Sequence, residues 1–158
     1  MSDNNKTSNN MNVPQLNLEN FTSSGNLSTD TSLNIYSKTT NYSYYNGLTF
    51  VLFYSKPCCK DEIEVFKVLN SKLNQINSTR NIPLKFYIYE TSRGTNSAIF
   101  SILEHASYRI MGFPYIVTYF NGEFCSVYKP NDLPESNILE NELIKYANKI
   151  SQKSSCKI

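Results

Sequence analysis

The stretch that decides the fold reads Tyr108-Arg-Ile-Met-Gly-Phe-Pro-Tyr-Ile-Val-Thr-Tyr-Phe-Asn-Gly-Glu123. Its apolar residues 115–120 predict a β-strand, and the Asn121-Gly122 pair that follows is typical of a two-residue hairpin turn. Residues 123–128 alternate as the returning strand, so this stretch predicts a β-hairpin. Pro114 stands directly in front of it.

Further strands and helices are expected on both sides of the hairpin. Residues 48–54 are a continuous apolar and aromatic run, typical of a strand buried on both faces, and residues 83–89 predict a second strand. Residues 59–76 carry apolar side chains at three- and four-residue steps, which predicts an amphipathic helix. Helices are also expected over 97–107 and 138–150, and a short edge strand over 33–36. The order β-α-β-α-β-β-α implies a parallel pair with a helical crossover plus an antiparallel hairpin.

The chain divides into three parts by composition. Residues 1–32 are mostly Asn, Ser, Thr and Asp with scattered apolar residues, so we expect a disordered arm. Residues 33–150 contain all the patterned segments and predict one domain. Residues 151–158 are expected to be a flexible tail.

Charge and cysteine content narrow the functional classes. The net charge is +2 and the basic residues are interspersed with acidic ones, so no nucleic-acid partner is expected. No apolar run is long enough to span a bilayer, and the first ten residues lack the apolar stretch of a signal peptide. Four cysteines are too few for a secreted disulfide scaffold. We expect a soluble protein of a reducing intracellular compartment. The abundance of Asn, Lys, Ile and Tyr resembles the proteins of AT-rich large DNA viruses and protists, so a virion is a second expectation.

Two segments resemble thioredoxins and protein disulfide isomerase domains. Residues 50–60 are similar to their strand, cysteine loop and helix start, and residues 108–123 are similar to their cis-proline segment, with Pro114 at the cis-proline. The resemblance covers about three quarters of the chain and implies an α/β thioredoxin-like fold, a mixed β-sheet flanked by helices. It also implies a cis Phe113-Pro114 bond and a substrate chain that docks beside these two residues.

The thiol motif departs from the family pattern. The family uses Cys-x-x-Cys, in which the first thiolate lies at a helix N-terminus and the second thiol releases the mixed disulfide. This chain has Pro57-Cys58-Cys59-Lys60-Asp61. Counting from the strand puts Cys58 at the nucleophile, whereas counting from the helix face puts Cys59 at the second cysteine. The two alignments agree if this chain lacks the two residues that separate the cysteines in the family motif, which leaves Cys58 and Cys59 adjacent. Cys58 is then the attacking thiol, and Cys59 is expected to point inward from the helix.

Three functional classes follow, of which a thiol-disulfide oxidoreductase is preferred. Its partners would be protein disulfides or glutathione mixed disulfides, with no cofactor and no metal, because no second Cys/His pair lies near Cys58 and Cys59. The alternative is a redox-inactive thioredoxin-fold binding or structural module, with packaging in a virus particle as one setting for it. Asp61 and Glu62 favour this alternative because their charges oppose a thiolate at Cys58. A glutathione transferase or peroxidase would need cysteine motifs that are absent. Cys125 is expected to be a structural thiol, and Cys156 a distant candidate for a resolving one.

Overall fold

The computed structural model describes residues 13–22, 25–27, 46–55, 58–91, 113–128 and 132–153. The described elements are η1 (Leu18–Asn20), β1 (Leu48–Tyr54), α2 (Lys60–Ser71), α3 (Leu73–Asn77), β2 (Leu84–Glu90), β3 (Tyr115–Phe120), β4 (Glu123–Tyr128) and α5 (Ser136–Lys153). The strand expected over 33–36 and the helix expected over 97–107 lie outside the described residues.

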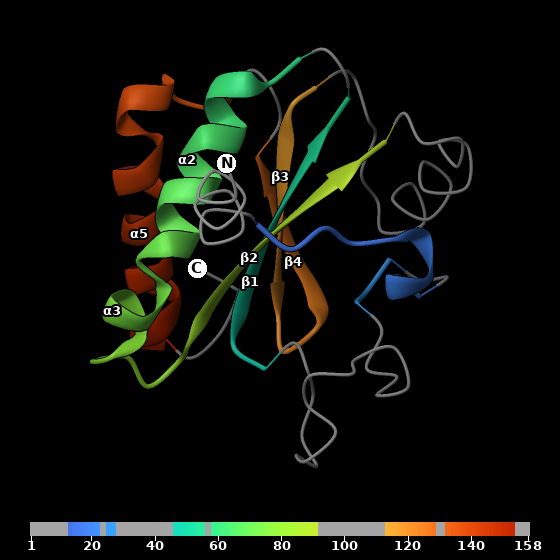
Figure 1. The fold of residues 1–158 in the computed structure, drawn as a ribbon. Helices are drawn as coiled ribbons and strands as arrows, with labels where there is room; N and C mark the ends of the chain where they lie inside the picture. Colours follow the sequence, from blue (N-terminus) through green and yellow to red (C-terminus); the bar gives the residue numbers. More distant parts are fainter. Residues whose placement is uncertain are drawn as a thin grey trace, which may run out of the picture.

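The four strands form one mixed sheet in the order β2-β1-β3-β4. β1 and β2 are parallel, whereas β3 is antiparallel to both β1 and β4. Figure 1 shows α2 and α5 side by side on one face of this sheet. The mixed sheet flanked by helices that the sequence predicts is therefore present, including the parallel pair and the hairpin.

The hairpin turn has the backbone geometry that its sequence demands. Asn121 and Gly122 have φ angles of 51° and 90°, and positive values at both central positions define a type I′ turn. Asn121 also joins the turn to the start of β1, because its side-chain oxygen accepts a hydrogen bond of 2.8 Å from the Gly47 N–H. Gly47 has φ +94°, and a Cβ there would collide with the Pro83 carbonyl oxygen, so glycine is required at this crossing.

The first long helix differs from the sequence expectation at both ends. It begins at Lys60, not Cys59, because Cys59 has φ 82° and lies in the left-handed region. It is interrupted at Lys72, whose φ of −100° and ψ of 10° separate α2 from the short α3. α5 is longer than the predicted 138–150. None of the helices in the described ranges combines the length and apolar character needed to cross a membrane.

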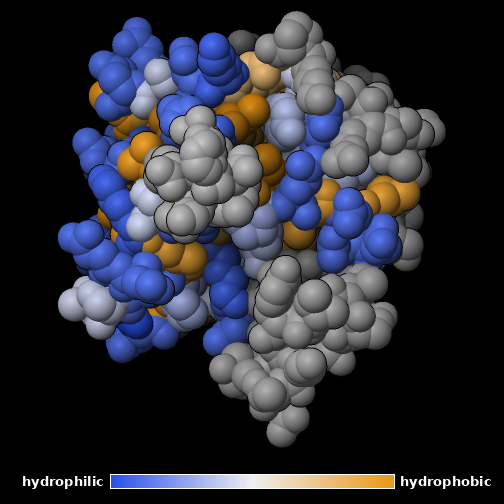
Figure 2. All heavy atoms as spheres, viewed as in Figure 1, coloured by the Kyte–Doolittle hydropathy of each residue, from blue (hydrophilic) through white to orange (hydrophobic). Residues whose placement is uncertain are grey.

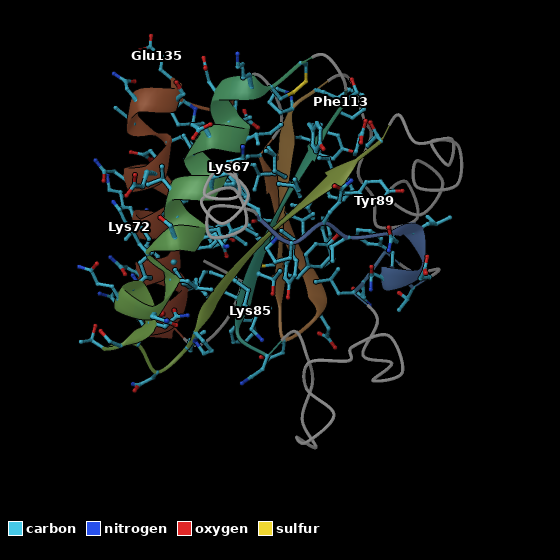
Figure 3. All side chains as sticks on the ribbon, in the orientation of Figure 1. Lys67, Lys72, Lys85, Tyr89, Phe113 and Glu135 are labelled. Carbon is cyan, nitrogen blue, oxygen red and sulfur yellow. A yellow bond between two sulfur atoms is a disulfide. The ribbon has the colours of Figure 1, made fainter. Side chains whose placement is uncertain are left out.

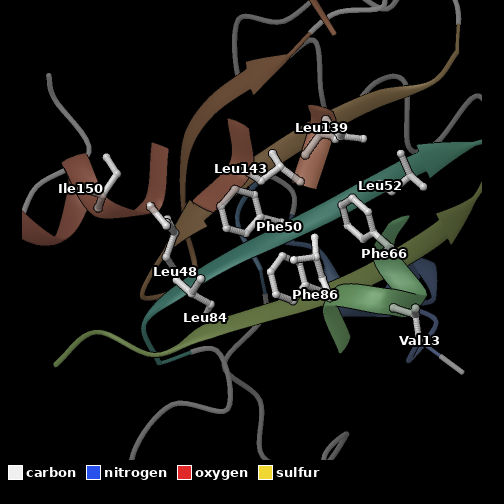
Figure 4. Close-up of a cluster of buried hydrophobic side chains, with 13 residues drawn as sticks. Val13, Leu48, Phe50, Leu52, Phe66, Leu84, Phe86, Leu139, Leu143 and Ile150 are labelled. Carbon is white, nitrogen blue, oxygen red and sulfur yellow. The ribbon is translucent and has the colours of Figure 1, made fainter. Parts of the chain in front are cut away.

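One face of the sheet packs against α2 and α5. Figure 4 shows the side chains of this helix-covered face, where Phe50 and Phe86 stack with ring centroids 5.3 Å apart. The two helices contribute apolar residues at helical spacing: Phe66 and Leu69 from α2, and Leu139, Leu143, Ala147 and Ile150 from α5. This packing is what amphipathic periodicity predicts.

The opposite face of the sheet is rich in aromatic side chains and is covered in part by the N-terminal segment. It contains the buried residues Val51, Phe53, Tyr87, Tyr89, Tyr115, Val117 and Tyr119. We call residues 13–22 and 25–27 the N-terminal strap. Its first residue, Val13, packs into the helix-covered core, and from β2 onward the strap crosses the opposite face, as the blue trace in Figure 1 shows. Its side chains Leu16, Phe21 and Leu27 are 4%, 7% and 2% exposed.

The strap is hydrogen-bonded to the sheet at both of its ends. At the β2 edge, the Leu16 N–H donates to the Ile88 carbonyl at 2.9 Å and the Ile88 N–H donates to the Pro14 carbonyl at 3.1 Å. At the hairpin, the Leu27 N–H donates to the Gly122 carbonyl at 2.7 Å. The expectation of a disordered arm is therefore wrong for residues 13–22 and 25–27. Their sparse apolar residues are buried because the sheet offers an aromatic face that local composition does not reveal.

Candidate functional site

The cysteine pair stands between the end of β1 and the start of α2. The Cys58 N–H donates to the Ser55 carbonyl at 2.7 Å, which turns the chain at the end of the strand. Cys59 is the N-cap of α2, and its carbonyl accepts from the Ile63 N–H at 3.0 Å. The sulfur atoms of Cys58 and Cys59 are joined as a disulfide, with Cα atoms 3.7 Å apart. The strand and the helix thus hold both sulfur atoms at one helix N-terminus.

Cys58 and Cys59 have similar accessibility, since both are half-buried. Cys59 was expected to occupy a helical position that points inward. That expectation is wrong, because the left-handed backbone of Cys59 places it before the helix. Residues other than glycine seldom adopt this left-handed backbone conformation.

The charges around the pair act in opposite directions. A helix N-terminus has amide N–H groups without intrahelical partners and favours negative charge nearby. The first turn of α2, however, already carries the carboxylates of Asp61 and Glu62. Among the described residues, no group of three or more His, Cys, Asp or Glu side chains is arranged to hold a metal ion.

The proline segment precedes β3 and is supported by stacked aromatic rings. The Phe113-Pro114 bond is cis, as the sequence resemblance implied. The Phe113 ring stacks on Tyr115 with centroids 5.6 Å apart, and Tyr115 stacks on Phe53 with centroids 4.9 Å apart and rings 5° from parallel. These supporting rings were not recognised in the sequence. The signal was the two-residue alternation that puts residues 113 and 115 on one face.

The cysteine pair and the proline segment lie at the same end of the sheet. Phe53 of β1 is in register with Tyr115 of β3, so the chain leaves β1 toward Cys58 where it enters β3 from Pro114. Figure 3 shows the disulfide, in yellow, at the end of the molecule that carries Phe113. β2 ends there too, and the N–H and hydroxyl of Thr91 donate to the Tyr54 carbonyl at 2.8 and 3.0 Å. Three strands thus converge at this end.

Cys125 belongs to a different part of the molecule. It lies in β4 at the bulge opposite Thr118 and Tyr119, and Thr118 is in register with Phe50 in the middle of β1. Its Sγ is 3.5 Å from the Tyr146 hydroxyl, which also hydrogen-bonds Ser126 Oγ at 2.7 Å. Cys125 is disulfide-bonded and so is not the structural thiol that the sequence predicted. Cys156 lies outside the described residues.

Comparison with known proteins finds structural neighbours but no sequence relatives. No protein-family model matches the chain, and no curated protein matches it. The thioredoxin of Malassezia sympodialis (Mala s 13) matches with a TM-score of 0.42 and 15% identity, over 67% of this chain and 76% of its own. The likeness is distant. The reduced thioredoxin pre-protein of Schistosoma mansoni matches with a TM-score of 0.34 and 15% identity, over 65% of this chain and 81% of its own.

Proposed function

We propose that this protein is a thiol-disulfide oxidoreductase whose redox centre is the Cys58–Cys59 pair. The observation that carries the proposal is the position of this joined pair at the N-terminus of α2, at the end of the sheet where Phe113 and Pro114 enter β3. A helix N-terminus favours the thiolate form of a cysteine, which is the attacking species in disulfide exchange.

The reaction cycle needs only these two sulfur atoms and the substrate. In the reduced protein, the Cys58 thiolate attacks one sulfur of a protein disulfide or a glutathione mixed disulfide. A mixed disulfide forms and the other substrate sulfur leaves as a thiolate, which then takes up a proton. Cys59 Sγ, after losing its proton, attacks Cys58 Sγ and releases the second substrate thiolate. The protein is left with the Cys58–Cys59 disulfide, so two electrons have passed to the substrate.

The substrate chain is proposed to dock beside Phe113 and Pro114. Extended peptides bind to sheet edges and strand ends through backbone hydrogen bonds. Phe113 is half-buried and rests on Tyr115, so its ring has a fixed support and an accessible part. Tyr115, which supports the Phe113 ring, belongs to the sheet and therefore holds the ring in one position. A fixed ring can orient different substrate chains in the same way.

Reduction of insulin disulfides by dithiothreitol tests the redox proposal. We expect the wild-type protein to accelerate the reaction over dithiothreitol alone, and Cys58→Ser to return it to the uncatalysed rate. Cys59→Ser keeps the nucleophile but lacks the resolving thiol, so it should accumulate a mixed disulfide detectable by mass spectrometry. Equal rates for wild type and Cys58→Ser would overturn the proposal in favour of a redox-inactive binding module.

A charge substitution at the start of α2 tests the electrostatics. Asp61→Asn removes a carboxylate beside the pair, and charges near a helix N-terminus are worth about 0.3–1 kcal/mol. We therefore expect alkylation of reduced Cys58 at pH 7 to accelerate about two- to fivefold. Glu64→Gln removes the same charge one turn further along α2 and is the matched control. Equal rates for both variants would show that Asp61 does not act on Cys58.

The docking proposal has its own variant. Phe113→Ala should raise the KM for a disulfide-bonded peptide, whereas alkylation of Cys58 by a small reagent should stay unchanged because that reagent needs no docking surface. A raised KM accompanied by slower alkylation of Cys58 would show that Phe113 supports the site and does not contact the substrate.

A further inference from the structure

A cleft lies at the end of α2 that is remote from the cysteine pair. It is enclosed by the junction of α2 and α3, the connection over residues 79–82, and α5, and its volume is about 470 Å³. Small-molecule sites have volumes of roughly 300–1,000 Å³. The α5 side of the cleft is one helix face, formed by Glu140, Ile144, Asn148 and Ser151.

The inner part of the cleft is apolar. Ile76, Ile82 and Ile144 line it, and all three are partly buried against the helix-covered core. Figure 2 shows apolar patches between the predominantly hydrophilic side chains on the helical side of the molecule. A bound molecule would therefore meet an aliphatic surface backed by the core.

The polar groups of the cleft have an excess of positive charge. Lys72 Nζ is paired with Glu140 Oε2 at 2.9 Å, which joins α5 to the α2–α3 junction. Arg80 has no such partner among the described residues. Its Nη2 donates to Asn148 Oδ1 at 2.8 Å, but no carboxylate of the described residues lies within ion-pair distance of its guanidinium. Burial of this cation lowers the pKa of Arg80.

A hydroxyl group on the α5 side also lacks a partner. Ser151 Oγ is buried and makes no hydrogen bond within the part of the chain that the structure describes. A buried polar atom without a partner is uncommon in folded proteins and costs about 1–3 kcal/mol. Arg80 and Ser151 thus offer an unmatched cation and an unmatched hydroxyl beside one apolar surface.

We propose that this cleft binds a small amphipathic monoanion, a molecule with one carboxylate and an aliphatic chain. The carboxylate would pair with Arg80, since a planar guanidinium matches a carboxylate with two parallel N–H···O bonds. The aliphatic chain would lie along Ile76, Ile82 and Ile144. A monoanion fits because the Lys72–Glu140 pair is already neutral and leaves the charge of Arg80 as the excess.

Titration of the full-length protein with octanoate, followed by methyl and backbone NMR, tests the site. We expect the methyl signals of Ile76, Ile82 and Ile144 to shift, while those around Cys58 do not. Octanol lacks the charge and acetate lacks the chain, so both should bind at least about tenfold more weakly. Arg80→Gln should weaken octanoate binding by about tenfold or more, whereas Lys145→Gln, which removes a cation from the exposed side of α5, should leave it unchanged.

The proposal fails under any of three results. The first is that octanoate at millimolar concentration shifts no signals of these isoleucines. The second is that octanol binds as tightly as octanoate, and the third is that the two charge variants bind octanoate equally. Circular dichroism of both variants establishes that each is folded before binding is compared. None of these outcomes depends on whether Cys58 is redox-active.

Discussion

The helix-covered face and the strap-covered face of the sheet are both apolar, but different kinds of segment cover them. On the first, α2 and α5 bury side chains at three- and four-residue steps, and each helix satisfies its own backbone hydrogen bonds. On the second, the strap buries Leu16, Phe21 and Leu27 at steps of five and six residues. At its two ends, the backbone of the strap is hydrogen-bonded to β2 and to the hairpin turn.

The helices and the strap therefore depend on the sheet for their own structure to different degrees. A helix has local structure of its own, which packing then stabilises. The strap has only a three-residue 3₁₀ turn, η1, so its order depends on a sheet that is already formed. We therefore expect the strap to be the less stable unit, able to detach while the sheet and helices remain folded.

The largest effect is expected on the helix-covered face. Phe50→Ala removes a ring that is 0% exposed and stacks on Phe86, and such truncations cost about 3–5 kcal/mol. Urea unfolding followed by circular dichroism measures the cost. Ile138→Ala is the control, because this side chain is 46% exposed and should cost little. A cost under about 1.5 kcal/mol for Phe50→Ala would contradict the assignment of this face as the main core.

A smaller effect is expected on the strap-covered face. Phe21 contacts Phe53, Tyr89 and Tyr119, with ring centroids 5.8, 5.5 and 6.4 Å away. Phe21→Ala should cost about 1–3 kcal/mol, since the loss is limited to the free energy with which the strap docks. Hydrogen exchange should accelerate at Leu16 and Leu27 but not in β1. Acceleration in β1 as well would show that strap and sheet unfold together.

Double variants test whether the strap and the helix-covered face contribute independently to the free energy of unfolding. Adding Leu27→Ala to Phe21→Ala should cost less than the sum of the single variants, because a detached strap has no further contacts to lose. Adding Phe21→Ala to Phe50→Ala should give nearly the sum, because the two rings lie on opposite faces. Strict additivity within the strap would show that it does not detach as a unit.

A pH-dependent effect is expected at the helix-covered face. Burial, followed by the neighbouring Tyr146 and Glu142, raises the pKa of Tyr128 to about 12 from its ordinary value of 10.0. The folded state thus prefers the neutral phenol, so this stabilisation is complete below pH 10 and is lost as the pH rises through about 12. Between pH 10 and about 12, the free energy of unfolding of Tyr128→Phe should fall less steeply with pH than that of the wild type. Urea unfolding at several pH values measures it.

The smallest effect is expected at Thr49 in β1. Its Oγ1 is buried without a hydrogen-bond partner among the described residues. Thr49→Val replaces the hydroxyl by a methyl group of similar shape, so stability should stay equal or rise by up to about 1 kcal/mol. Thr91→Val is the matched control and should destabilise by about 0.5–1.5 kcal/mol, because the Thr91 hydroxyl donates to the Tyr54 carbonyl at 3.0 Å. A loss at Thr49 equal to that at Thr91 would contradict this prediction.

Local patterns predicted the regular elements well. The run over residues 48–54 and the hairpin with its Asn121-Gly122 turn were located to the residue, because strand alternation and turn chemistry depend on near neighbours. The α2 boundary was less accurate: the helix was predicted from the spacing of apolar residues, which does not reveal the left-handed backbone that makes Cys59 a cap. The cysteine pair and Pro114 could be singled out as candidates. The alternation of residues 113 and 115 placed both rings on one face, but the stacking of Tyr115 on Phe53 of another strand was not predictable from neighbouring residues.

The sequence by itself determined the four described strands, the approximate extents of α2 and α5, the cis-proline candidate and the adjacency of Cys58 and Cys59. Each of these depends on residue types within a few positions of one another, where propensity and periodicity act. Only the tertiary structure decided that the strap packs, that Tyr115 and Phe53 stack beneath Phe113, and that Arg80 meets Ile144 in one cleft. Those contacts join residues far apart in the chain, so their energies arise only when the sheet brings the surfaces together.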